Sequence, residues 1–355
     1  MSSACAKPLI LDPRVEGLRN ERIEASPRFR DGQFHNTFPV VPGIKGNSLP
    51  VLGEYFFSKN ARVPSVTLPL VSPLAAWAAL PETGLRATWL GHSTVLLEID
   101  GVRVLTDPVF GERASPLTFA GPKRFHPPPA AIEQLPALDA ILISHDHYDH
   151  LCKTSITKLR ALDVPFVTSL GVGRRLESWG VPAQRITELD WWEEHVLPGG
   201  RLSFTAAPAQ HFSGRGFGDR NRTLWSSWRL QTDRHRVFFS GDTGLTEELF
   251  EIGRRLGPFD LTMLEVGAWH PSWGDIHLGP ENALVAHRML GGGTLLPVHW
   301  GTFNLALHDW DEPAETLVRR AEEAGTRVIT PLIGAALEPA RVEAPNAWWR
   351  ALGGR

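Results

Sequence analysis

Three histidines and one aspartate stand within six residues of the chain, at His145, His147, Asp149 and His150. They directly follow the apolar run of residues 138–143, so we expect the cluster on a loop after a buried strand. Imidazole nitrogens and carboxylate oxygens suit zinc and similar divalent ions. A His-rich surface loop is the alternative, but the 14 histidines are spread over the whole chain, which argues against it.

Three later segments offer further ligands for a site with two metal ions. His211 and His299 each come at or just after a predicted strand, and Asp242 lies in a turn between Gly241 and Gly244. Taken singly, each histidine suits a buried core position and the aspartate suits a turn. As a set with the first cluster, they complete two coordination shells. The residues therefore predict a dinuclear metal site.

The surrounding pattern predicts an α+β fold. Strands are expected at residues 86–90, 94–99, 102–105, 138–143, 166–169, 185–189, 201–207, 226–231, 237–240, 261–266, 294–298 and 327–331. Helices are expected at residues 154–161, 244–255, 280–290 and 312–324. Strands joined first by hairpins and then alternating with helices fit an αββα sandwich, in which two mixed sheets are flanked by helices.

Longer stretches around these residues carry a family resemblance over roughly residues 85–303. They include Thr88-Trp-Leu-Gly-His-Ser-Thr-Val95, Leu105-Thr-Asp-Pro-Val-Phe110, Arg113-Ala-Ser-Pro116, Gly121-Pro-Lys-Arg-Phe125, Glu188-Leu-Asp-Trp-Trp-Glu-Glu194, Gly257-Pro-Phe-Asp-Leu261 and His299-Trp-Gly-Thr-Phe303. The metal motifs resemble the metallo-β-lactamase superfamily. The longer stretches resemble the N-acyl-phosphatidylethanolamine-hydrolysing phospholipase D family within it.

The resemblance implies how two divalent ions, expected to be zinc, divide the ligands. One ion would lie on His145, His147 and His211, and the other on Asp149, His150 and His299, with Asp242 bridging them. Asp107 matches the superfamily's structural aspartate and is expected to orient a ligand. His92 belongs to the family pattern and is expected to be structural.

The resemblance also implies two catalytic residues. Asp149 would hold the second metal and orient the nucleophile. His277 matches a family histidine near the substrate phosphate, where it would position the phosphate or assist the leaving group; an ordinary histidine before a helix is the alternative. The chain departs from the family at Cys152, where an acidic residue is usual, at Ile276, which replaces a polar neighbour, and in residues 269–273.

The expected activity is phosphodiester hydrolysis, on N-acyl-phosphatidylethanolamine or a related phosphodiester. Two close divalent ions lower the pKa of water from about 15.7 toward ~7 and so supply a nucleophile. The alternative is a lactonase, esterase or other metallo-hydrolase of the same fold. The bridging Asp242 argues against a true β-lactamase. A diiron redox protein usually carries Glu at the position of His147, and a non-catalytic metal scaffold would not need the full ligand set.

The composition of the chain limits the kinds of partner that we expect it to bind. With 355 residues, a net charge of -3 and a pI near 6.5, the chain shows no general attraction for nucleic acid. Two cysteines and no secretory signal predict a cytoplasmic protein. The apolar segment of residues 68–80 either contacts a membrane peripherally or packs on the fold. Five of the 13 tryptophans lie in polar surroundings and either build the core or wall a substrate cleft: Trp191, Trp192, Trp269, Trp273 and Trp300. The oligomeric state stays open.

The domain prediction follows from where the periodicity begins. Residues 1–84 are rich in Pro, Asn, Gly and Arg and are expected to form an irregular N-terminal extension packed on the main domain, with a short helix near residues 73–80. Residues 85–355 are expected to form the hydrolase domain.

Overall fold

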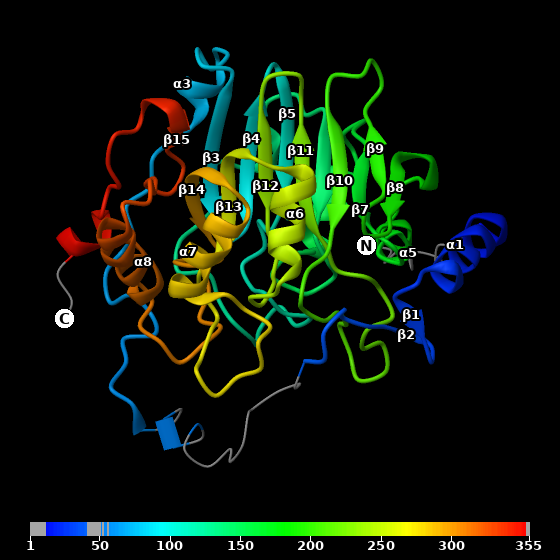
Figure 1. Ribbon diagram of the computed structural model, residues 1–355, viewed down its shortest axis with the longest axis horizontal. Coiled ribbons are helices and arrows are strands. Elements are labelled where there is room, and N and C mark those ends of the chain that lie inside the picture. Colours follow the sequence, from blue (N-terminus) through cyan, green and yellow to red (C-terminus); the bar gives the residue numbers. More distant parts are fainter. Residues whose placement is uncertain (1–11, 41–50, 52, 55–56, 353–355) are drawn as a thin grey trace, which may run out of the picture.

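Two mixed β-sheets pack face to face in a computed structural model that describes residues 12–40, 51, 53–54 and 57–352 (Figure 1). The first sheet has the strand order β15 (Ala336–Leu337), β3 (Leu85–Gly91), β4 (Thr94–Ile99), β5 (Val102–Thr106), β6 (Ala140–Ile143), β7 (Phe166–Ser169) and β8 (Ile186–Leu189). The second has the order β14 (Gly292–Val298), β13 (Phe259–Glu265), β12 (Arg236–Phe239), β11 (Ser227–Gln231), β10 (Ser203–Ala207) and β9 (Glu194–Val196).

Helices cover the outer faces of both sheets. On the first sheet these are α4 (Lys153–Leu159) and α5 (Gly173–Ser178), and Ile156 and Leu176 pack there in one apolar cluster with Phe166. On the second sheet they are α6 (Glu248–Leu256), α7 (Gly279–Met289) and α8 (Glu312–Ala324) (Figure 1). The predicted αββα sandwich is therefore confirmed. Short 3-10 turns lie at Ile132–Gln134, Ala183–Arg185, Pro339–Arg341 and Trp348–Leu352.

The main core lies between the sheets and under the helices of the second sheet. Trp89, Phe204, Trp228 and Phe238 are fully buried there. Each such side chain contributes on the order of 1.5–3 kcal/mol on burial, so the sandwich is a stable platform for the loops at its edge. Trp300 also belongs to this core, where it stacks on Trp89 with ring centroids 5.0 Å apart.

One edge of the sandwich collects the loops that carry polar residues. Strands β3 and β5 both run antiparallel to β4, and β6 runs parallel to β5, so β3, β5 and β6 end at the same edge. In the second sheet β10 and β12 are antiparallel to β11, while β13 and β14 are parallel to β12. The residues after these strand ends can therefore meet across the two sheets.

Several residues at this edge have the sparsely populated positive φ. Among them are His92, Asp107 and His299, with φ values of 52°, 32° and 64°. Each costs of order 1–3 kcal/mol and persists because the surrounding structure holds it. Close approach also requires glycine at Gly267, where a Cβ would lie 2.1 Å from the His299 carbonyl oxygen. This edge thus stores strain where side chains converge.

Most predicted elements are present within ±4 residues, and some differ. The strand predicted at residues 327–331 is wrong, because only Val328 makes an isolated bridge, to Leu295. The helix predicted from residue 244 begins at Glu248, since the preceding residues form a turn. Strand β9 and helix α5 were not predicted. Of the tryptophans proposed to wall a cleft, Trp191 is buried, as Trp300 is.

The N-terminal residues contain more order than an irregular extension. Helix α1 (Pro13–Ala25) is followed by a hairpin of β1 (Phe29–Arg30) and β2 (Gln33–Phe34). Buried Arg19 pairs with Glu177 and Glu188 at 2.6 Å each, which fixes α1 on α5 and β8. The pattern missed this helix because its buried residues are an arginine and one isoleucine. The division at residues 84 and 85 stays a prediction.

The apolar segment of residues 68–80 is partly packed and partly exposed. Leu68 and Trp77 are buried, while Leu74, in the short helix α3 (Leu74–Trp77), and Leu80 are 40% and 64% exposed. Within the described residues, the helices are too short or too polar to cross a membrane.

Candidate metal centre

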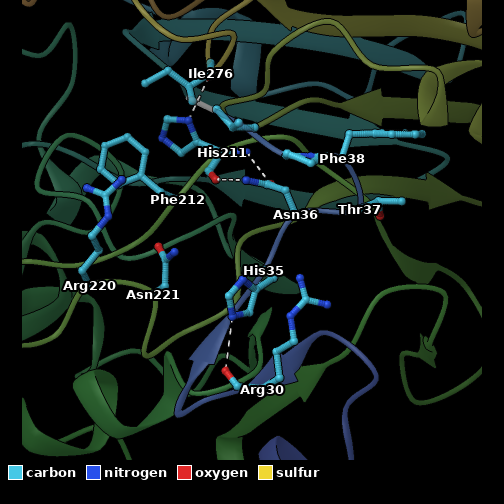
Figure 2. Close-up of a pocket in the computed structure, with 12 residues that line it drawn as sticks. Arg30, His35, Asn36, Thr37, Phe38, His211, Phe212, Arg220, Asn221 and Ile276 are labelled. Carbon is cyan, nitrogen blue, oxygen red and sulfur yellow. Dashed lines mark hydrogen bonds between the residues drawn. The ribbon is translucent and has the colours of Figure 1, made fainter. Parts of the chain in front are cut away.

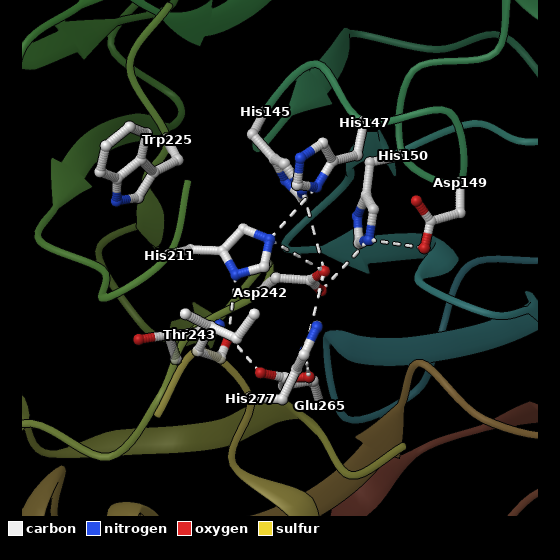
Figure 3. Close-up of polar contacts among 12 residues, drawn as sticks. His145, His147, Asp149, His150, His211, Trp225, Asp242, Thr243, Glu265 and His277 are labelled. Atoms are coloured by element: carbon white, nitrogen blue, oxygen red, sulfur yellow. Dashed lines mark hydrogen bonds and ion pairs between the residues drawn. The ribbon is translucent and has the colours of Figure 1, made fainter. Parts of the chain in front are cut away.

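Three histidine nitrogens form a first donor set at the edge of the sandwich (Figure 3). Nδ1 of His147 lies 2.9 Å from Nε2 of His145 and 3.2 Å from Nε2 of His211. Ligand nitrogens around a tetrahedral zinc ion lie about 3.4 Å apart, given Zn–N bonds of about 2.0–2.1 Å. The three rings therefore present a face of the size that a zinc ion needs.

A second donor set lies beside the first. Oδ2 of Asp149 is 3.2 Å from Nε2 of His299 and 3.5 Å from Nε2 of His150. Asp242 lies between the two sets: its Oδ1 is 3.1 Å from His150, and its Oδ2 is 3.3 Å from His299. The same Oδ2 lies 3.8 Å from His145, in the first set. Asp242 therefore faces both sets.

Unsatisfied buried atoms show that these residues suit cations. Nε2 of His150 and Oδ1 of Asp242 are buried and face each other at 3.1 Å, but neither has a partner with hydrogen-bond geometry. Leaving a buried polar atom unpaired costs about 1–3 kcal/mol. A cation between the two sets would satisfy both atoms, and the donor chemistry of nitrogen and carboxylate oxygen suits divalent transition metals.

The ring protons of the ligands are held from behind by hydrogen bonds. Asp107 accepts from the backbone N and the Oγ of Ser144 at 2.7 and 2.6 Å, and from Nδ1 of His150 at 2.7 Å. The Ser144 hydroxyl donates its proton to Asp107, so its oxygen accepts from Nδ1 of His145 at 2.9 Å. Nε2 of each ring is then the nitrogen that faces the cluster, where a metal can bind it. Asp107 thus has the orienting place that we expected.

His92 lies closer to the donors than a purely structural residue would. Its Nε2 donates to Oδ2 of Asp149 at 3.0 Å, and its ring centroid is 4.0 Å from that of His299. Burial, together with the neighbouring His299, lowers the pKa of His92 to about 3, so its ring is neutral. His92 therefore orients Asp149 or joins the second donor set.

The structure adds Glu265, which the sequence reasoning missed. This buried carboxylate ends β13, accepts from Nδ1 of His277 at 2.7 Å, and accepts from the backbone N of Thr243 and Leu278 at 2.9 and 3.1 Å. His277 therefore lies at the cluster with one ring nitrogen already engaged. The available signal was an acidic residue flanked by Leu264 and Val266 in a strand predicted to be buried.

Burial and neighbouring charges give the histidines of the two donor sets different pKa values. Burial holds the pKa of His145 and His211 well below the usual value, so the first set is neutral. In the second set, burial alone would lower the pKa of His299, but Asp242 and Asp149 raise it to about 10. His150, facing the same carboxylates, likewise has a pKa well above normal despite its burial. A cation in the second set must therefore displace protons.

The structure brings together all seven residues that were predicted to bind metal, and His277 with them. Cys152 takes no part in the donor sets. Its buried thiol lies 3.0 Å from Oγ1 of Thr154 and packs with Val109 and Phe303. At this departure from the family, the side chain therefore packs on apolar residues and contacts the Thr154 hydroxyl.

Comparisons with known proteins agree with the geometry. The family described as Beta-lactamase superfamily domain matches residues 102–300. The fold resembles a metallo hydrolase of the archaeon Ignicoccus hospitalis, with a TM-score of 0.56 and 23% identity over 71% of this chain and 97% of that one. The chain belongs to the metallo-β-lactamase superfamily and is a metal-dependent hydrolase of that class.

Two relatives narrow the comparison. The chain is 38% identical to N-acyl-phosphatidylethanolamine-hydrolyzing phospholipase D 1 of Caenorhabditis elegans, over 88% of this chain and 90% of that protein. It is 45% identical to an uncharacterized protein of Mycobacterium tuberculosis, over 92% of this chain and 88% of that protein. The family resemblance inferred from the motifs is therefore confirmed.

Proposed function

We propose that the protein binds two zinc ions and hydrolyses a phosphodiester, in the manner of a phospholipase D acting on N-acyl-phosphatidylethanolamine or a close relative of that lipid. The observation that carries the proposal is Asp242, a carboxylate facing two converging donor sets. The similarity to the C. elegans phospholipase D over nearly the whole chain supports hydrolysis of a phosphodiester bond.

The bound metals would activate water and neutralise charge on a phosphoryl oxygen, and the chain's own residues would orient the reacting groups. Asp149 is held by His92 at 3.0 Å, so its carboxylate is fixed where a nucleophile would be oriented. Asp242 keeps the two donor sets in one relative position. These contacts place the reacting groups before substrate binds.

His277 provides the proton donor that the reaction needs. Burial lowers its pKa, but Glu265 at 2.7 Å raises it by more, so the net pKa of His277 is raised and the charged form of the ring is favoured. Since Nδ1 is engaged by Glu265, Nε2 is the nitrogen that donates to the phosphate or to the leaving oxygen. This role is more specific than the one expected from the sequence, and it does not require His277 to bind a metal ion.

A lipid substrate must reach this edge from a membrane. Helix α3 lies near the start of β3, whereas His92 follows the end of that strand, about 20 Å away (Figure 1). We therefore assign peripheral membrane contact to loops beside the cluster instead of residues 68–80. Leu117 shares a cavity with Tyr148 of the metal loop, and Phe217, on the loop after His211, is fully exposed.

Product analysis tests the proposal. Zinc-loaded protein is incubated with N-acyl-phosphatidylethanolamine in mixed micelles, beside a chromogenic phosphodiester and a lactone. Zinc-dependent release of phosphatidic acid and N-acylethanolamine is the expected result. His299→Ala should abolish it, and His235→Ala, which changes a histidine bound to Asp100 away from the cluster, should not.

The other outcomes are equally informative. Cleavage of the chromogenic phosphodiester alone would support phosphodiester hydrolysis but contradict a lipid substrate. Lactone hydrolysis without phosphodiester cleavage would overturn the proposed reaction in favour of a lactonase.

A further inference from the structure

Asn36, from the N-terminal part of the chain, contacts the backbone of the candidate metal ligand His211 (Figure 2). Its Nδ2 donates to the His211 carbonyl at 2.8 Å, and its Oδ1 accepts from the His211 backbone N at 3.0 Å. One amide side chain therefore pairs with both backbone polar groups of a ligand, as a neighbouring strand does in a sheet. Such a two-point contact restrains both the position and the rotation of the His211 backbone.

Phe34 anchors the stretch that carries Asn36, and we call residues 28–37 the N-terminal segment. The Phe34 side chain is fully buried in an apolar cluster that also contains Ala209 and Trp225. Ala209 lies two residues before the ligand. The N-terminal segment and the ligand loop therefore share one small core, which brings the amide to the ligand.

Two further hydrogen bonds fix the amide of Asn36 itself. Nε1 of Trp225 donates to Oδ1 of Asn36 at 3.1 Å. An indole N–H and a backbone N–H can only donate, so the amide oxygen must face both of them and the amide nitrogen must face the carbonyl. One residue further along, Oγ1 of Thr37 donates to Oε1 of Glu248 at 2.6 Å, which ties the N-terminal segment to α6. The N-terminal segment thus presents an oriented amide.

His211 depends on such contacts more than the other two ligands of its set. His145 and His147 belong to one loop after β6, whereas His211 follows β10 in the other sheet. Its ring donates from Nδ1 to the Ile276 carbonyl at 2.9 Å, and its Nε2 lies 3.2 Å from Nδ1 of His147. The Ile276 carbonyl therefore fixes the ring, and Asn36 fixes the backbone that carries the ring.

We propose that Asn36 is a positioning residue of the metal centre, which holds His211 where its Nε2 completes the first donor set. The inference rests on the proposed function, because it concerns the same two cations. Without Asn36, the backbone N–H and carbonyl of His211 lose their partners, and the loop moves to find others. Removing a partner that orients a metal ligand costs about 10–100-fold in metal affinity. Since Asn36 acts through His211, its loss weakens the first set more than the second.

Zinc affinities of the two sites test the proposal without any hydrolytic activity. Metal-free wild-type and Asn36→Ala proteins are loaded with zinc and titrated with a chromogenic chelator. We expect one zinc ion to bind at least about tenfold more weakly in the variant and the other to bind as in the wild-type protein. Unchanged affinities, or equal weakening of both sites, would overturn the proposal.

The matched control is the same substitution one residue along. Thr37→Ala removes the hydrogen bond from the N-terminal segment to Glu248 and leaves the two bonds of Asn36 to His211 in place. Both zinc ions should therefore bind as in the wild-type protein. If Thr37→Ala weakens one site as much as Asn36→Ala does, attachment of the whole N-terminal segment matters and the proposed role of the amide is wrong.

Cobalt spectra separate positioning from a loss of stability. The visible absorption of Co²⁺ depends on the geometry of its ligands, so the cobalt-loaded Asn36→Ala protein should differ from wild type and Thr37→Ala should not. Thermal unfolding of the metal-free proteins shows that each variant folds; if Asn36→Ala does not, Asn36→Leu removes the same hydrogen bonds and keeps the volume of the side chain. A lower unfolding temperature with an unchanged cobalt spectrum would reduce Asn36 to a structural residue and contradict the proposal.

The proposed function and this inference can fail separately. If two zinc ions bind and no phosphodiester is cleaved, the proposed reaction is wrong, and the zinc affinities still decide the role of Asn36. If the wild-type protein binds no zinc, the metal centre and the role of Asn36 are overturned together.

Discussion

The two donor sets differ in what stands behind them. The first set consists of three imidazoles, and neutral groups hold its rings: the Ser144 hydroxyl behind His145 and the Ile276 carbonyl behind His211. The second set contains the carboxylate of Asp149, and another carboxylate, Asp107, stands behind His150. Only Asp242 is common to both.

This difference gives the two positions different affinities for a cation. A cation is attracted more strongly to the second set, because two carboxylates besides Asp242 lie there. We therefore infer that the second position holds its metal more firmly than the first.

The largest effect is expected from the residue that both sets share. Asp242→Ala removes a ligand of both cations, so we expect less than one zinc per chain and a loss of phosphodiesterase activity on the order of 10³-fold or more. Metal analysis and initial rates measure this. Asp233→Ala, at an exposed turn, is the control and should behave as wild type. An Asp242→Ala protein that keeps two zinc ions would break the account of a shared ligand.

Asp107→Asn should weaken the second set more than the first, because Asp107 accepts directly from His150 but contacts His145 only through the Ser144 hydroxyl. The amide keeps the size of the side chain but loses the charge that holds Nδ1 of His150, and such changes cost about 10–100-fold in metal affinity. Competition titration with a zinc chelator should show one site weakened more than the other. Equal weakening of both sites would contradict this difference between the two donor sets.

Glu265→Gln tests the proton donor beside the metals. We expect kcat to fall by at least about tenfold with zinc content unchanged, because a positioned acid contributes about 10²–10⁴-fold. Glu265 raises the pKa of His277, and activity needs the protonated ring, so activity is lost as pH rises through that pKa. In the variant this loss should move to lower pH. A pH profile of kcat identical to the wild-type profile would remove His277 from the reaction.

The smallest effect compares proton release by the two sets. In the metal-free protein the pKa of His299 is about 10 and that of His150 is also raised, whereas burial keeps His145 and His211 unprotonated. At pH 7 the tighter zinc should therefore release protons and the weaker zinc almost none. Calorimetry in buffers of different ionisation enthalpy measures both steps. Proton release with the weaker zinc only would reverse our assignment.

The convergence of the candidate metal ligands could be predicted from sequence because their signals are local. His145 to His150 lie in one loop, and His211, Asp242 and His299 each follow a recognisable apolar strand. The layers of the fold followed from the same apolar pattern.

What the sequence did not predict depends on contacts between distant residues. Glu265 acquires its role only through His277, across a loop, and α1 is fixed by the buried ion pairs of Arg19. The contact of the N-terminal segment with the cluster is equally non-local, since Asn36 donates to the His211 carbonyl across 175 positions. Local periodicity carries no information on such pairings.

The zinc content of the purified wild-type protein tests the shared-ligand account most directly. Protein stripped with a chelator, reloaded with excess zinc and desalted is measured by plasma mass spectrometry together with its rate on a chromogenic phosphodiester. We predict two zinc ions per chain and a rate that rises only as the second ion binds. A fully active protein with one zinc, or two zinc ions without phosphodiester cleavage, would contradict the proposed centre.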